Sequence, residues 1–136
     1  MREIKFRAKI KAHDFEQKLA LINKPQNEGQ WAYGEIHVNS KIPHIHVGPY
    51  RYPIDIETIG QYTGLKDAND KDLYEGDIIS GFGGVMHHVK YEEAAFKCCL
   101  KGERYGFCIS QGWLTELEKV IIGNIHDNKE YLEEQL

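Results

Sequence analysis

The sequence lacks the features of a disulfide-rich, secreted or membrane-embedded protein. It has three cysteines in 136 residues and no Cys-x-x-Cys pair, which argues against a zinc ribbon or a thioredoxin-type redox pair. No run approaches the roughly 18 apolar residues of a membrane-spanning helix. The opening residues, 1–7, lack the apolar segment of a signal peptide. We therefore expect a cytoplasmic protein with reduced thiols and no membrane partner.

An excess of positive charge is also missing. The 17 Lys and Arg residues are outnumbered by 21 Asp and Glu residues, so the formal net charge is −4. This excludes the simplest class of nucleic-acid-binding protein, which is basic overall, but it leaves room for a local basic patch. Hydrophobic residues make up 41% of the chain. A chain of this size and composition buries enough surface to fold without a disulfide or a structural metal.

The clearest periodic pattern lies at the start of the chain. Residues 4–12 alternate between apolar and basic side chains, which predicts a half-buried strand with one basic face. The next segment, residues 14–24, fits a helix or a strand, and Asp14 with Gln17 could form a capping box at a helix start. A further strand is expected over residues 31–38, where Gly34 could mark a bulge. Pro43 and Pro49 enclose a short extended piece.

The composition changes near Pro53. From Thr58 onward the chain shows short apolar segments separated by glycine-containing turns, which is typical of a small β-barrel or roll. We therefore predict a mainly β protein with two parts: a β-rich N-terminal region over residues 1–56, and a barrel with a short C-terminal tail over residues 57–136. Strands are expected at 58–62, 77–80, 85–91, 96–100, 107–110 and 120–126.

Three segments match a known family in order along the chain. The central one is Thr58-Ile-Gly-Gln-Tyr-Thr-Gly-Leu-Lys-Asp67, followed by Tyr74-Glu-Gly-Asp-Ile78. The start, Arg2-Glu-Ile-Lys-Phe-Arg-Ala8, and the close, Ile122-Gly-Asn-Ile125, fit the same pattern. The chain resembles the YopX family of phage and prophage proteins. It departs from the family pattern after Ala8 and at Asn69-Asp70, where the family usually has an Asn-Gly turn.

This resemblance implies an SH3-like barrel in the C-terminal part and a phage or prophage origin, hence a location in the bacterial host cell. It implies no catalytic residue. The signature residues have a structural interpretation: Gly76 would supply a positive φ, and Asp77 would accept hydrogen bonds from amides of the turn. The residues of this structural signature are Gly60, Gln61, Tyr62, Gly64, Tyr74, Gly76, Asp77, Gly123 and Asn124.

The candidate metal ligands form no convincing set. His44 and His46 share one face of a strand about 7 Å apart at Cα and could chelate an ion. His87 with His88, and Cys98 with Cys99, are adjacent and point to opposite faces. Because a tetrahedral site needs three or four converging ligands, we expect no native metal and no cofactor. The segment 67–72 fails as a calcium loop, 81–84 fails as a phosphate loop, and Cys108 as a nucleophile has no evident base.

The strongest remaining candidate is a surface for nucleic acid or a protein partner. It combines the basic row of the first strand with an aromatic and cationic segment, and its residues are Arg2, Lys5, Arg7, Lys9, Lys11, Tyr50, Arg51 and Tyr52. Such residues suit contacts to phosphates and stacked bases. The alternative is an edge strand that carries charges to prevent self-pairing. We expect a non-enzymatic binding module that acts on a host or phage protein, with nucleic-acid binding as the alternative.

Self-association is a further expectation. The N-terminal strand is cationic, and the tail from residue 128 to 136 is anionic with a few apolar side chains. A symmetric homo-oligomer could pair the two and cover an open strand edge.

Overall fold

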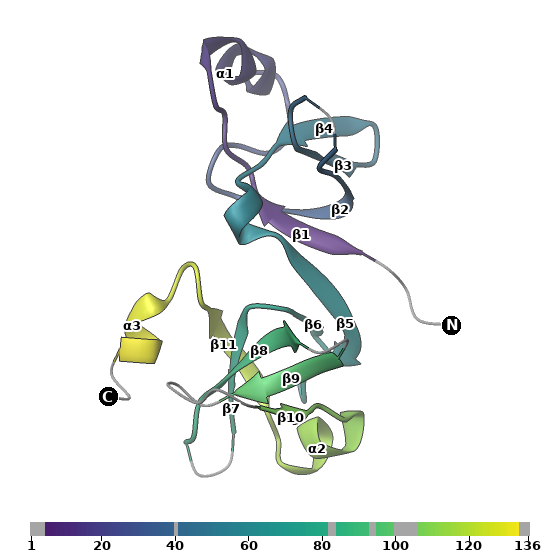
Figure 1. The fold of residues 1–136 in the computed structure, drawn as a ribbon, viewed down its shortest axis with the longest axis vertical. Coiled ribbons are helices and arrows are strands. Elements are labelled where there is room, and N and C mark those ends of the chain that lie inside the picture. The colour runs from purple at the N-terminus through teal and green to yellow at the C-terminus, as the bar shows by residue number, and fades with distance from the viewer. Residues whose placement is uncertain (1–4, 40, 82–83, 93–94, 100–105, 134–136) are drawn as a thin grey trace. The chain divides into compact units, whose positions relative to one another are not determined.

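The computed structural model describes residues 5–39, 41–81, 84–92, 95–99 and 106–133 (Figure 1). The protein is mainly β, as predicted. Its contacts divide it into two compact units, with the boundary between Gln61 and Tyr62. This division falls inside strand β5 (Gly60–Lys66), a few residues beyond the boundary expected from composition.

The N-terminal unit is an antiparallel sheet in the order β4-β3-β2-β1, and the start of β5 adds to β1. Its strands are β1 (Phe6–Lys9), β2 (Trp31–His37), β3 (His44–Val47) and β4 (Tyr50–Pro53). The alternation of residues 4–12 accounts for β1, since Ala8, Ile10 and Ala12 are buried. The core of this unit is completed by Leu21, Ala32, Ile45, Tyr52 and Ile54.

Gly34 has a different role from the bulge that we expected. The register between β1 and β2 is continuous, with Phe6 opposite Gly34 and Arg7 opposite Tyr33. A side chain at Gly34 would instead collide with the backbone carbonyl of His46 on β3. Glycine therefore permits a close approach of β2 and β3 at this point.

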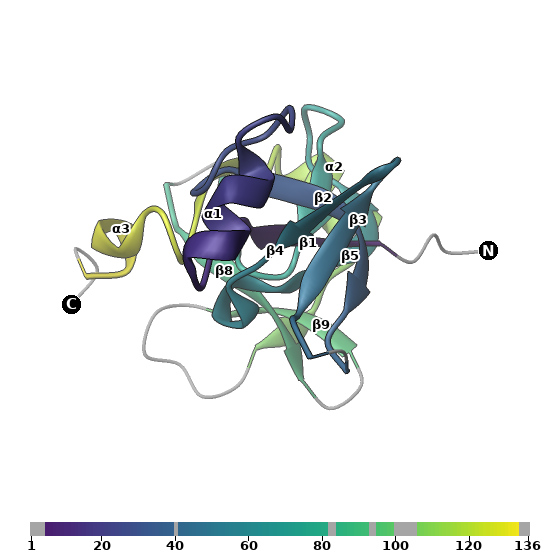
Figure 2. The same ribbon diagram turned by 90° about the horizontal axis from the view of Figure 1, so that it is seen from above.

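The ambiguous segment after β1 is a helix, α1 (Phe15–Leu21), seen beside β4 in Figure 2. The predicted cap is present: the side chain of Asp14 accepts a hydrogen bond from the backbone N–H of Gln17 at 2.9 Å. The helix contributes Leu21 to the core. Phe15, Leu19 and Ile22 lie at helical spacing but are exposed, so this spacing marks a solvent-facing stripe.

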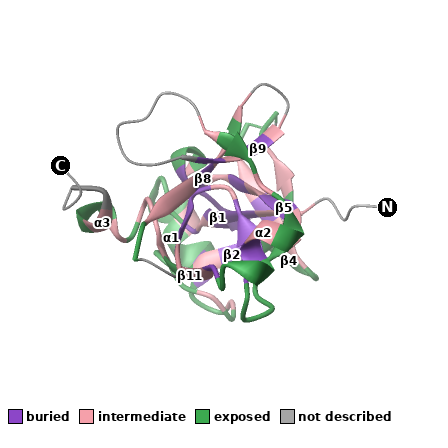
Figure 3. Cartoon of the chain, turned by 90° about the horizontal axis from the view of Figure 1, so that it is seen from below, coloured by how far each residue is buried: buried purple, intermediate pink, exposed green. Residues whose placement is uncertain are grey.

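The C-terminal unit contains an antiparallel sheet in the order β10-β9-β8-β7-β11. Its strands are β7 (Asp77–Ser80), β8 (His87–Glu92), β9 (Ala95–Cys99), β10 (Phe107–Cys108) and β11 (Val120–Asn124). Apart from this sheet, β5 pairs with β6 (Asp72–Tyr74). The core comprises Leu73, Ile79, Val89, Cys98 and Leu114, of which Val89 is the one buried residue of β8. Figure 3 shows exposed residues on α3 (Lys129–Glu133). Between the described β10 and β11 no pairing is present, so the sheet is open over the described residues.

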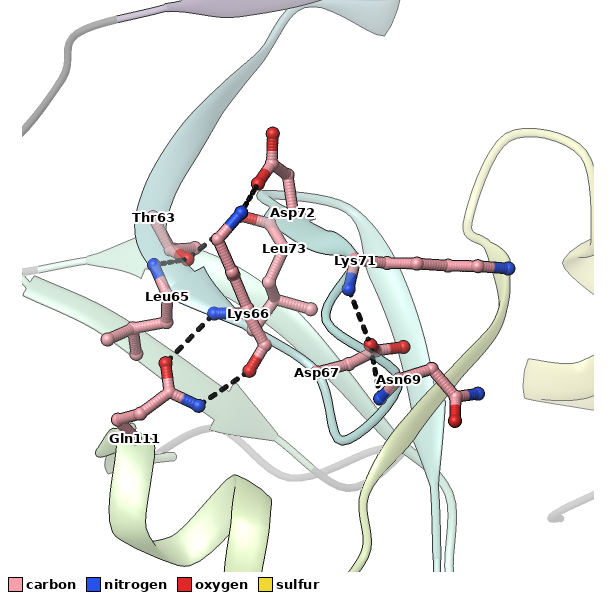
Figure 4. A network of polar contacts seen from close by, with 9 residues as sticks. All are labelled: Thr63, Leu65, Lys66, Asp67, Asn69, Lys71, Asp72, Leu73 and Gln111. Atoms are coloured by element: carbon pink, nitrogen blue, oxygen red, sulfur yellow. Dashed lines mark hydrogen bonds and ion pairs between the residues drawn. The ribbon is translucent and has the colours of Figure 1, made fainter.

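A buried carboxylate organises one end of this unit. Asp67 Oδ1 accepts hydrogen bonds from the backbone N–H groups of Asn69 and Lys71, each at 2.9 Å (Figure 4). Its Oδ2 accepts a third from the backbone N–H of Ile121 on β11, also at 2.9 Å. Asp67 is 3% exposed. Both oxygens therefore hold backbone groups, and the segment 67–72 is a structural turn that connects to β11.

Short polar contacts also fix the helix α2 (Gln111–Glu116). Ser110 caps it by accepting a hydrogen bond from the N–H of Trp113 at 3.1 Å. The amide side chain of Gln111 accepts from the N–H of Lys66 at 3.0 Å and donates to the carbonyl of Lys66 at 2.7 Å (Figure 4). The start of α2 is thus held against the end of β5.

The signature residues occupy structural positions in the two units. Gly76 has φ +95°, and Asp77 Oδ2 accepts from the N–H of Tyr74 at 2.8 Å, which confirms the predicted turn. Gly64 also has a positive φ, beside a register shift between β5 and β6. Gly60 and Gln61 pair with Arg7 and Phe6 of β1, and the rings of Tyr62 and Tyr74 lie 5.5 Å apart.

The closing motif forms a tight turn. The side-chain oxygen of Asn124 accepts hydrogen bonds from the N–H groups of His126 and Asp127, at 3.0 and 2.9 Å. Asn128 in turn accepts from the N–H of Asn124, and a Cβ at Gly123 would collide with the Asn128 side chain. These residues start α3, a short helix in the C-terminal tail, whose last described residue is Glu133. None of the described helices is long and apolar enough to cross a bilayer.

Candidate functional site

The strand register of the N-terminal unit collects polar side chains on one face of its sheet. Glu35 on β2 lies opposite His46 on β3, and His37 lies opposite His44. On the next strand, Arg51 lies opposite His46. Because cross-strand partners and residues two apart share a face, these five residues lie on the side away from the apolar core.

Three of these side chains form a compact histidine cluster, His37, His44 and His46. The rings of His37 and His44 are stacked with centroids 5.0 Å apart, and the His46 ring lies 4.5 and 4.8 Å from them. One nitrogen from each ring lies within 4.8 Å of the others. The cluster is thus a set of three potential metal ligands on adjacent strands.

Hydrogen bonds constrain the histidine cluster. His44 Nδ1 lies 2.9 Å from the carbonyl oxygen of Ile42, and because a carbonyl only accepts, Nδ1 carries the proton. His37 Nε2 lies 3.5 Å from a carboxylate oxygen of Glu35. His46 Nε2 is buried and has no hydrogen-bond partner among the described residues.

The electrostatic environment keeps His46 neutral. Desolvation is the largest influence and lowers the pKa of His46 below its ordinary value of 6.5. His37, His44 and Arg51 lower this pKa further, whereas Glu35 opposes the shift. The imidazole therefore keeps a lone pair at neutral pH.

The basic row of β1 is only partly accessible. Arg7 is 6% exposed, and its guanidinium lies 4.7 Å from the centre of the Trp31 ring. Lys9 also lies over Trp31, at 5.6 Å. Lys5 and Lys9 are half-buried and Lys11 is exposed, whereas Arg2 lies outside the described residues. The strand thus contributes fewer accessible charges than the sequence indicated.

The segment Tyr50–Tyr52 is divided between surface and core. Tyr50 and Arg51 are exposed, but Tyr52 is 1% exposed and belongs to the hydrophobic core. Tyr52 is therefore unavailable for stacking on a ligand. Tyr33, which the sequence did not single out, is 48% exposed beside Arg7 on β2.

A groove of about 380 Å³ borders the histidine cluster. Three cationic residues line it, Lys24, Lys41 and Arg51, together with His44 of the cluster. We call this the cationic groove; the other residues that line it are Glu16, Gln17, Ala20, Ile42 and Pro53. The Lys24 ammonium is held in place, since it donates to the carbonyl of Arg51 at 2.5 Å and lies 5.5 Å from the Tyr52 ring.

Charge is distributed unevenly along the chain. Residues 1–61 contain nine Lys and Arg and seven Asp and Glu, whereas residues 62–136 contain eight and 14. The overall acidity thus comes from the C-terminal part. The part that carries the cationic groove is weakly basic, which the total composition concealed.

The C-terminal unit has its own cavity, of about 440 Å³, which is lined by Cys108 and by residues of β5, β8 and β9. Cys108 is exposed with a free thiol. No histidine is among the residues that line this cavity. His87 packs edge-on against Phe107 and Trp113, at 5.6 and 5.5 Å, in an aromatic cluster.

Sequence reasoning found two of the three clustered histidines and one of the three cationic groove residues. His37 was missed because its proximity to His44 depends on the pairing register of β2 and β3. Treating the two flanking strands as a hairpin, with residue 37 paired to residue 44, would have revealed this proximity. Lys24 and Lys41 lie in connecting segments, where no period relates them to Arg51.

A family model for the YopX protein matches residues 5–133. The chain belongs to the YopX family. This agrees with the signature segments: the first one overlaps the start of the matched range, and the other two lie inside it. The chain is also similar to the crystal structure of protein EF1440 from Enterococcus faecalis, with a TM-score of 0.55 and 22% identity. That match covers 97% of this chain and 99% of EF1440, and it supports the fold. None of the curated proteins matches the sequence significantly.

Proposed function

We propose that this YopX family member is a phage or prophage accessory protein that binds an anionic partner without catalysing a reaction, in the cytoplasm of the bacterial host. The observation that carries the proposal is the cationic groove, where Lys24, Lys41 and Arg51 line one hollow of the N-terminal unit. Converging cations in a concave site attract and orient an anionic ligand. Lys41 and Arg51 are exposed, and the contacts of Lys24 reduce its freedom before binding.

An acidic segment of a host or phage protein is the partner that we favour. The groove also presents apolar atoms of Ala20, Ile42 and Pro53 beside the charges. A peptide with carboxylates and apolar side chains would fit both features, whereas a phosphate backbone uses only the charges.

Nucleic acid is the second candidate, and exposed aromatic rings favour it. Tyr33 is 48% exposed and Tyr50 39% exposed, and cationic residues adjoin both. Aromatic rings near cations can stack bases beside phosphate contacts. However, the alternation of side chains along the strands places Tyr33 and Tyr50 on opposite faces of the sheet. One strand of nucleic acid would therefore contact only one of these rings.

Binding of two labelled probes, a Glu-rich peptide and a single-stranded oligonucleotide, would test the proposal. Both are titrated by fluorescence anisotropy at several salt concentrations. If three cations contact phosphates, log K against log salt has a slope of about −2. Lys41→Gln and Arg51→Gln should each weaken binding, whereas Lys18→Gln, an exposed lysine of α1 outside the groove, serves as the matched control.

The outcomes separate the candidates. Tight binding of the peptide alone supports the protein partner, and tight binding of the oligonucleotide with the expected slope supports nucleic acid. Failure of both probes, or equal affinity of all three variants, would overturn the assignment of the groove.

We also infer that the C-terminal unit is an SH3-like barrel. The strand order supports this: β7 pairs with both β8 and β11, and α2 precedes the last strand.

We also propose that the protein self-associates through its acidic C-terminal tail, residues 128–136. Light scattering should reveal a species larger than the 15.7 kDa chain. A variant truncated after residue 127 should form less of this larger species.

A further inference from the structure

We propose that His37, His44 and His46 bind one divalent transition-metal ion, with Zn²⁺ as the first candidate. This inference is independent of the anionic partner proposed above. Imidazole nitrogens suit Zn²⁺, Ni²⁺ and Cu²⁺, whereas Mg²⁺ and Ca²⁺ prefer oxygen ligands. Three histidines leave a fourth position for water or another ligand, as in many zinc sites.

The geometry of the histidine cluster is close to that of a bound site. A tetrahedral zinc ion with Zn–N bonds of about 2.0–2.1 Å places its ligand nitrogens about 3.4 Å apart. In the structure the three nitrogens lie within 4.8 Å of one another. The rings therefore need to approach by at most about 1.4 Å, which side-chain rotation supplies.

The backbone already fixes the positions of the ligands. His44 and His46 are two apart on β3, and His37 lies directly opposite His44 on β2. Gly34 permits the close approach of these two strands. Sites on paired strands hold their ligands more precisely than sites on loops.

Two polar observations independently point to a ligand. His44 Nδ1 donates to the carbonyl of Ile42 at 2.9 Å, which leaves Nε2 with its lone pair. This is the usual arrangement of a metal-binding histidine, whose other nitrogen donates to a carbonyl or carboxylate. His46 Nε2 is buried with no partner among the described residues, and a metal ion would supply one.

The charges around the histidine cluster determine how well it holds a cation. Glu35 lies beside His37 at 3.5 Å and can orient this ring or contribute an oxygen. Arg51 lies opposite His46 and opposes a positive ion. The carboxylate offsets this guanidinium, and we expect Glu35→Gln to weaken metal binding about tenfold.

The test is a titration of the metal-free full chain with Zn²⁺ against a chromophoric chelator, and with Co²⁺ by absorption spectroscopy. We expect one ion per chain and the intense visible bands of low-coordinate Co²⁺. His37→Gln and His46→Gln should each weaken Zn²⁺ binding at least tenfold. His13→Gln, which removes a histidine of the same unit outside the cluster, should bind as the original chain does.

Folding of the variants is checked by circular dichroism without metal. The His37 side chain is 41% exposed, so His37→Gln should fold normally. This variant keeps the test decisive even if His46→Gln fails to fold. Absence of stoichiometric Zn²⁺ binding, or equal affinity of the His37→Gln and His13→Gln variants, would overturn the proposal. Anion-probe binding measured with and without Zn²⁺ separates this site from the proposed function, since either can fail alone.

Discussion

Removal of the Asp67 carboxylate should destabilise the C-terminal unit strongly. Asp67 accepts hydrogen bonds from three backbone N–H groups, of Asn69, Lys71 and Ile121, each at 2.9 Å. It is 3% exposed, so water cannot replace the carboxylate in the folded state without rearrangement. The bond to Ile121 spans 54 residues of sequence and connects the turn to β11.

The cost of Asp67→Ala follows from what each amide loses. Asn69 and Lys71 are exposed residues whose N–H groups can turn to water, so each loses about 0.5–1 kcal/mol. The N–H of Ile121 is in a half-buried strand residue, and leaving it unpaired costs about 1–3 kcal/mol. We expect a total of about 2–5 kcal/mol, equivalent to a fall in melting temperature of about 7–17 °C.

Two further variants make the test specific. In Asp67→Asn one oxygen can still accept the turn amides, but the NH₂ group faces the N–H of Ile121, so we expect about half of the loss. Asp72→Ala removes the ion pair of Asp72 with Lys66, whose atoms are 2.7 Å apart on a partly exposed surface. This control should cost about 0–1 kcal/mol.

The measurement is urea and thermal unfolding followed by circular dichroism. If the free energies of unfolding of Asp67→Ala and of the Asp72→Ala control differ by less than about 1 kcal/mol, the Asp67 carboxylate is not the organising contact. Chemical shifts of the Ile121 amide in Asp67→Asn give a second, local readout.

Three other outcomes are expected. Gly76→Val should destabilise the chain by about 1–3 kcal/mol in denaturant melts, because valine resists the φ of +95° at this turn; unchanged stability would refute the role of the turn. Asp70 has φ +65°, so Asp70→Gly should stabilise by up to about 1 kcal/mol, and a loss would contradict this. Burial, then Lys90, lowers the pKa of His88 below 6.5. As the pH falls, His88 is therefore protonated in the unfolded chain before it is protonated in the folded chain. The free energy of unfolding should decline below about pH 6.5, and His88→Gln should reduce this decline.

Local patterns in the sequence determined much of the secondary structure. The alternation of residues 4–12 predicted β1 and its buried face because strand side chains alternate with a period of two. The strand Asp77–Ser80 and the turn at Gly76 followed from a glycine, the residue that adopts a positive φ most readily. The cap of α1 at Asp14 likewise depends on neighbouring residues only. Family membership was also readable, since the signature segments are continuous.

The tertiary structure decided which of these residues meet. The register of β2 against β3 brings His37 to His44 and His46, and the sequence contains no period that relates them. Burial separated residues of one type: Arg7 is covered although Lys11 is exposed, and Tyr52 is core although Tyr50 is on the surface. Asp67 reaches Ile121 only because β11 folds back beside β7. Contacts between distant segments depend on packing and register, and these are properties of the whole fold.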